Sequence, residues 1–98
     1  MLGPAERKSL RKQAHHLKPT VFLGKDGLTE TVVSALKESL DAHELIKVRF
    51  VDFKESKKDL AGQLAMRSES ELVGMIGHLV ILFREHPDES KRKVKATG

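Results

Sequence analysis

The residues best suited to chemistry lie between an apolar run at 21–23 and a favoured helix N-cap, Thr29. They form the sequence Gly24, Lys25, Asp26, Gly27. Glycines leave the backbone open to close approach, a lysine neutralises a phosphate, and a helix N-terminus adds partial positive charge. The spacing lacks the Lys-Ser/Thr ending of a P-loop. Two interpretations stay open: a contact to a phosphate backbone, or only a tight strand-to-helix turn.

Positive charge lies around this turn and at both ends of the chain. The net charge is +4 over 98 residues, and residues 1–29 carry six basic and two acidic side chains. Such a distribution suits a polyanion, although a solvated surface would look the same. Besides Lys25, the candidate contacts in this region are Arg7, Lys8, Arg11, Lys12 and Lys18.

Enzymatic and metal-binding sites are not indicated. The chain has no Cys and no His-Glu-x-x-His motif, and the neighbours His15 and His16 would point about 100° apart on a helix. We therefore predict no catalysis, no metal and no cofactor. With four Phe but no Trp or Tyr, stacking of single-stranded bases is disfavoured, and contacts to backbone and shape are favoured.

Helices are predicted where apolar residues recur with helical spacing. The first should cover residues 4–18, since Leu10, Ala14 and Leu17 share one stripe and Pro19 follows. The other two should cover residues 30–42 and 57–68.

Strands are predicted at residues 20–23, 45–51, 72–76 and 79–84. In the second strand, Lys47 and Arg49 alternate with apolar residues, which predicts one packed and one partly open sheet face. The two basic residues there suit either binding or solubility. The apolar stretch 71–85 could also form a helix, but its β-formers and the pair Gly77-His78 favour a hairpin.

The predicted fold class is α+β (mixed α/β), in the order α-β-α-β-α-β-β. Strands separated by helices should pair in parallel and the last two should pair antiparallel, which makes one four-stranded mixed sheet with helices packed on it. We expect a single domain over residues 1–85 and a flexible basic tail over residues 86–98. No stretch resembles a membrane span or a signal peptide, so a cytoplasmic protein is expected. We also expect a monomer.

Four stretches, in this order and spacing, resemble the YhbY family, the bacterial stand-alone form of the CRM domain (chloroplast RNA splicing and ribosome maturation). They are Leu17-Lys-Pro19, Leu23-Gly-Lys-Asp-Gly-Leu-Thr29, Ala42-His-Glu-Leu-Ile-Lys-Val48 and Gly77-His-Leu-Val-Ile-Leu-Phe-Arg84. The resemblance covers roughly residues 7–85. It implies a fold similar to the C-terminal domain of translation initiation factor three.

The resemblance also implies a function. It indicates an RNA-binding protein that uses a Gly-x-x-Gly loop, here residues 24–27, associates with large-subunit ribosomal RNA precursors and assists ribosome assembly. His78 and Phe83 stand where the family often has a basic residue and a Tyr. The alternative is a protein–protein adaptor on the ribosome without direct RNA readout.

Overall fold

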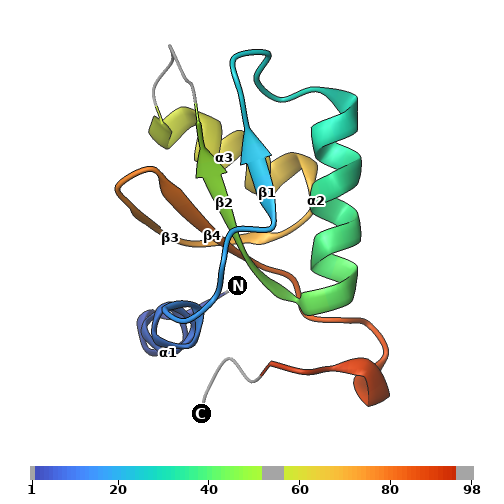
Figure 1. The fold of residues 1–98 in the computed structure, drawn as a ribbon. Coiled ribbons are helices and arrows are strands. Elements are labelled where there is room, and N and C mark those ends of the chain that lie inside the picture. Colours follow the sequence, from blue (N-terminus) through green and yellow to red (C-terminus); the bar gives the residue numbers. More distant parts are fainter. Residues whose placement is uncertain (1, 52–56, 95–98) are drawn as a thin grey trace.

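The computed structural model describes residues 2–51 and 57–94, and it contains three α-helices, four strands and one short 3₁₀ helix (Figure 1). The elements are α1 Pro4–Ala14, β1 Val21–Leu23, α2 Glu30–His43, β2 Leu45–Phe50, α3 Lys57–Arg67, β3 Glu71–Ile76, β4 Leu79–Phe83 and η1 Glu89–Lys91. The α+β class and the mixed sheet predicted from the sequence are confirmed. No helix within the described residues is long and apolar enough to cross a membrane.

The sheet has the strand order β1-β2-β4-β3. β1 and β2 pair in parallel, as predicted for strands joined by a helix. The same expectation is wrong for β2 and β3, because β4 lies between them and pairs antiparallel with both. Burial agrees with this arrangement: Val80 to Phe83 are all buried, which is typical of a strand that has a neighbouring strand on each side and helices over the sheet.

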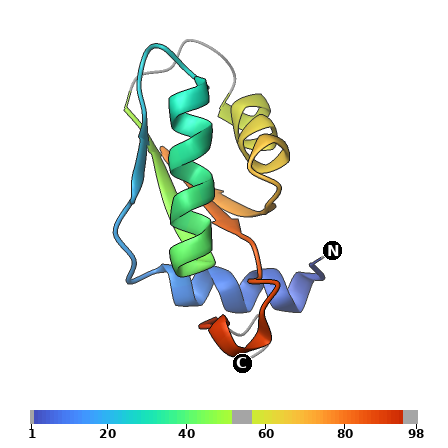
Figure 2. The same cartoon turned by 90° about the vertical axis from the view of Figure 1, so that its right-hand side faces the viewer.

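One face of the sheet is covered by α2 and α3, and the other face is covered by α1 at one end only (Figure 2). The first layer encloses the main core, with Leu36 and Leu40 of α2 and Leu64 of α3 against Val48 of β2. The second, smaller cluster consists of Leu10, Ala14, Leu45, Val73, Ile81 and Phe83. Burying a side chain such as Leu10 stabilises the fold by about 2 kcal/mol, so this cluster contributes to the docking of α1.

The first helix ends at Ala14, earlier than the predicted residue 18. Two amides that follow continue the chain in tighter turns, with the His15 amide donating to the Lys12 carbonyl at 3.3 Å and the Leu17 amide to the Ala14 carbonyl at 3.0 Å. Leu17 consequently leaves the buried stripe and is 38% exposed. The helical spacing of Leu17 was therefore misleading, because the helix ends at Ala14, three residues before it.

The segment from residue 86 onward, for which the composition predicts a flexible basic tail, has defined contacts over residues 86–94. Residues 86–94 lie against the end of α2, where the buried carboxylate of Glu44 accepts hydrogen bonds from the amides of His86 at 2.7 Å and Val94 at 3.0 Å. The Lys93 amide donates to the same carboxylate. One buried acidic group thus anchors this stretch of chain, an interaction that charge composition does not predict. Residues 95–98 lie outside the described part.

Candidate functional site

The turn at residues 24–27 has an open backbone. The Gly27 amide donates to the Gly24 carbonyl at 3.0 Å, and Gly27 has a φ of 71°, which a side chain would strain. A Cβ atom at either glycine would meet nothing within 4 Å. Lys25 and Asp26 are exposed at the tip. A ligand backbone can therefore approach this turn without displacing protein atoms.

The turn leads directly into α2. The Thr29 hydroxyl accepts a hydrogen bond from the Val32 amide at 3.2 Å, which caps the helix as its sequence predicted. Glu30 in the first turn forms an ion pair with Arg67 of α3 at 2.6 Å. The positive end of a 14-residue helix thus lies next to the exposed lysine of the turn.

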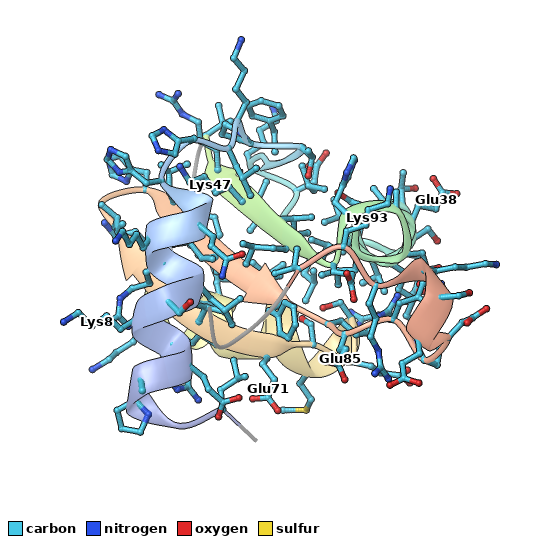
Figure 3. All side chains as sticks on the ribbon, turned by 90° about the horizontal axis from the view of Figure 1, so that it is seen from below. Lys8, Glu38, Lys47, Glu71, Glu85 and Lys93 are labelled. Atoms are coloured by element: carbon cyan, nitrogen blue, oxygen red, sulfur yellow. The ribbon has the colours of Figure 1, made fainter. Side chains whose placement is uncertain are left out.

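The basic residues of α1 divide into two groups. Lys8, Arg11 and Lys12 are exposed, and Lys8 points away from the helix into solvent (Figure 3). Arg7 is half-buried and donates from Nη1 to the carbonyl of Leu72 in β3. Arg7 therefore holds α1 on the sheet, which removes it from the outward-facing basic set.

Arg11 combines exposure with packing. Its Cδ lies 3.0 Å from where a Cβ of Gly74 would stand. The absence of a side chain at Gly74 lets the stem of Arg11 cross β3. The guanidinium group also lies near β3, with Nη1 4.0 Å from the same Cβ position of Gly74.

The prediction that Lys47 and Arg49 share an open face is wrong for Lys47. Lys47 is only 8% exposed, and its ammonium group donates to the carbonyls of Leu17 and His15 beyond the end of α1, where Figure 3 places it. The sequence correctly predicted that Lys47 and Arg49 point to the same face of the sheet, but α1 and the chain after it cover the position of Lys47. Arg49, two residues further along β2, is exposed.

Lys18 lies apart from the turn as well. It is exposed and lines a hollow together with Leu17, His43 and Val94, between the chain after α1 and the C-terminal segment. The turn and α1 lie at opposite ends of the molecule in both views (Figures 1 and 2). The predicted basic residues therefore form separate groups at the two ends.

Between these groups lies a part of the sheet that α1 does not cover. Register pairs Phe22 with Arg49, Arg49 with Leu79 and Leu79 with Ile76, so the four side chains form one row across all four strands. We call this row the open sheet surface. Phe22 is 56% and Ile76 is 55% exposed, and Leu79 is half-buried.

Sequence reasoning did not identify this surface. The run of apolar residues at 21–23 indicates a buried strand, and only the alternation separates Phe22 from its buried neighbours. Of the other phenylalanines, Phe50 and Phe83 are buried, and Phe53 lies outside the described residues. Phe83 is therefore inaccessible for stacking, whereas His78 is exposed at the tip of the β3–β4 hairpin.

Two carboxyl groups have lowered pKa values: Asp88 in the C-terminal segment, and Glu44, which binds the backbone of that segment. Burial raises the pKa of Glu44, but three backbone amides and the nearby His86 outweigh this and hold it below its usual value. Hydrogen bonds from Ser90 lower the pKa of Asp88. Within the described residues, no group of three or more His, Cys, Asp or Glu side chains could hold a metal ion.

Comparisons with known proteins agree on one family. Residues 2–84 match the model of the CRS1 / YhbY (CRM) domain. The chain is 36% identical over 92 residues to a Bacillus subtilis protein named "Probable RNA-binding protein YqeI", covering 93% of this chain and 96% of that one. It is 36% identical over 84 residues to a Haemophilus influenzae protein named "RNA-binding protein", covering 85% of each.

A solved structure has the same fold. The solution structure of the hypothetical protein SAV1595 from Staphylococcus aureus matches with a TM-score of 0.81 and 31% sequence identity. The match covers 97% of this chain and 100% of that one. The α+β architecture of this chain is therefore shared with a solved bacterial protein.

Proposed function

Because this chain belongs to the CRS1/YhbY (CRM) domain family, we propose that it binds structured RNA, without catalysis, and assists assembly of the large ribosomal subunit on ribosomal RNA precursors. Relatives that match nearly its whole length are named as RNA-binding proteins. In this proposal the protein acts in the cytoplasm and as a monomer.

The open turn carries this proposal. Gly24 and Gly27 leave space for a sugar-phosphate chain, because nothing stands within 4 Å of either Cβ position. Lys25 neutralises a phosphate there, and the N-terminus of α2 adds partial positive charge. These groups recognise the backbone rather than the base sequence.

The exposed side of α1 supplies the second region of RNA contact. Lys8, Arg11 and Lys12 lie at the opposite end of the molecule from the turn. The molecule measures 37 Å along its longest axis, so binding at both ends requires a folded RNA or a long strand. Arg49 lies between the two ends, and Lys18 near α1 adds charge. Arg7 and Lys47 support the fold instead.

The test is the salt dependence of RNA affinity. Bound phosphates release counterions, so affinity should fall steeply with salt. The triple variant Arg11→Ala, Lys12→Ala, Lys25→Ala should bind more weakly, and the slope of log affinity against log salt should fall by about one for each cation removed from a phosphate, so by about three. The charge-matched control Lys37→Ala, Lys58→Ala, Lys91→Ala removes three exposed lysines elsewhere. An equally large decrease in affinity in both variants would contradict the assigned surface.

The RNA target is tested in cells. Crosslinking followed by sequencing of the bound RNA should recover precursors of the large-subunit ribosomal RNA, and sedimentation should place the protein with large-subunit precursors. Association that persists after RNase treatment of the isolated complex would indicate the adaptor function instead. Random recovery of cellular RNA would contradict the ribosomal target while leaving RNA binding intact.

A further inference from the structure

The open sheet surface is uncovered because α1 is short and crosses only one end of the sheet. Leu10 and Ala14 pack with Ile81 and Phe83, while the next pair toward the hairpin, Arg49 and Leu79, lies outside that cluster and Arg49 is exposed. The row Phe22, Arg49, Leu79 and Ile76 spans four strands, or about 14 Å. An aromatic ring more than half exposed on a sheet surface is accessible to a partner.

We propose that the open sheet surface stacks unpaired RNA bases, with Phe22 as the platform and Arg49 beside it. The proposal rests on the proposed function. It adds base stacking to an RNA interface whose contacts at the turn and at α1 are to phosphates. Every base has a π-face, so one ring accepts any base without specifying a sequence. The neighbouring guanidinium group can stack on a base or meet a phosphate.

Charge favours RNA over a protein partner. None of the four side chains in the row is acidic, and Arg49 lies within it. Arg11, held over Gly74 two residues before Ile76, borders the same face. The row thus combines an exposed aromatic ring and two aliphatic side chains with the cation Arg49, and Arg11 lies beside it. This combination of an apolar ring with flanking positive charge and no carboxylate matches a polyanion that carries planar apolar groups.

The position of Phe22 relative to the turn supports the same occupant. Phe22 precedes Gly24 by two residues, and β1 runs without interruption into the turn. β1 is also an edge strand, so no further strand of the described sheet stands beside the ring. An RNA backbone held at Gly24 and Gly27 therefore has the exposed ring within reach of its bases.

The chain allows a direct spectroscopic test, because it contains no Trp and no Tyr. The variant Phe22→Trp introduces a single fluorophore whose emission a stacked base should quench. Met66 of α3 is 76% exposed on the other layer, so Met66→Trp is the matched control. We expect single-stranded oligouridylate to quench the Phe22→Trp variant and to leave the emission of the Met66→Trp variant unchanged. An abasic oligonucleotide with the same phosphates should quench neither variant.

Affinity measurements separate stacking from simple apolar packing. Phe22→Ala should weaken binding of oligouridylate by roughly 5- to 150-fold, without changing the salt slope, because every cation that meets a phosphate is retained. Phe22→Leu keeps most of the apolar volume, but it should bind oligouridylate nearly as weakly as Phe22→Ala because the aromatic ring is missing. Phe22→Trp should bind at least as tightly as the wild type. Thermal unfolding of each variant checks that the fold is retained.

The outcomes distinguish the two proposals. Wild-type RNA binding that Phe22→Ala leaves unchanged would overturn stacking, leave the RNA function standing and assign the surface to a protein partner. Full affinity in Phe22→Leu, or equal quenching of both tryptophan variants, would also overturn it. A wild-type protein that binds no RNA at all would overturn the proposed function together with this inference.

Discussion

The ammonium group of Lys47 lies 3.0 Å from the carbonyl oxygen of Leu17, so a lysine of β2 donates a hydrogen bond to a backbone carbonyl just beyond the end of α1. It also lies 3.3 Å from the carbonyl oxygen of His15. Carbonyl groups after the last helical turn have no intrahelical partner. Lys47, which the alternation along the strand predicts to be a surface charge, therefore connects β2 with the chain that follows α1.

Lys47 and Arg49 should respond differently to the same substitution. Lys47→Met keeps the apolar stem but removes the donor, so the free energy of unfolding should fall by about 1–2 kcal/mol. Arg49→Met should change stability by less than about 0.5 kcal/mol while weakening RNA binding. Urea denaturation and RNA titration of both variants check this. Equal stability of the two variants would refute the structural role of Lys47.

Arg7 should contribute to stability rather than to RNA affinity. Arg7→Ala removes the donor to the Leu72 carbonyl, and because the site is half-buried we expect a decrease in stability of about 1 kcal/mol. Its neighbour Lys8 is exposed, so Lys8→Ala should be neutral in stability and lower the salt slope of RNA binding by about one. Thermal unfolding measures the loss of stability, and RNA titrations at several salt concentrations measure the slope. A loss of stability in Lys8→Ala and a lower salt slope in Arg7→Ala would contradict the roles assigned to these two residues.

The two glycines of the turn should separate folding from binding. Gly27 has a φ of 71°, so Gly27→Ala should destabilise the protein by about 1–2 kcal/mol. A methyl group at Gly24 meets no protein atom within 4 Å, so Gly24→Ala should leave stability nearly unchanged. If RNA backbone approaches the turn closely, Gly24→Ala should still weaken RNA binding. Unaltered binding by this variant would mean that the RNA does not touch Gly24.

Glu44 should make stability depend on pH. Its folded-state pKa is lowered, so its contribution is complete above the unfolded value of about 4.3 and is lost as the pH falls through the folded value. Glu44→Gln should cost about 1–3 kcal/mol at pH 7, because one buried acceptor oxygen becomes an amide nitrogen. The difference in stability between wild type and variant should narrow as the pH approaches about 3, below the unfolded pKa.

Urea denaturation at several pH values measures this difference. Glu38 is an exposed carboxyl of α2, labelled in Figure 3, and Glu38→Gln is the matched control that should remain close to wild type throughout. A difference for Glu44→Gln that stays constant over the whole range, from neutral pH to about 3, would contradict a lowered pKa in the folded state.

The sequence by itself determined the local structure around the turn at residues 24–27 and the hairpin at Gly77. Gly24, Gly27 and the cap at Thr29 act through backbone conformations and short-range hydrogen bonds, so the strand, turn and helix were predictable from adjacent residues. The hairpin at Gly77 has the same local origin, since Gly77 has a φ of 58°. The resemblance to one family, carried by these same stretches, likewise needed no coordinates.

Only the tertiary structure decided which side chains are covered. Alternation places Lys47 and Arg49 on one face, but the length and position of α1 bury the first and expose the second. The exposure of Phe22, the insertion of β4 beside β2 and the anchoring of residues 86–94 by Glu44 follow in the same way. Periodicity fixes the direction of a side chain relative to its own element, whereas cover depends on packing between residues far apart in the chain.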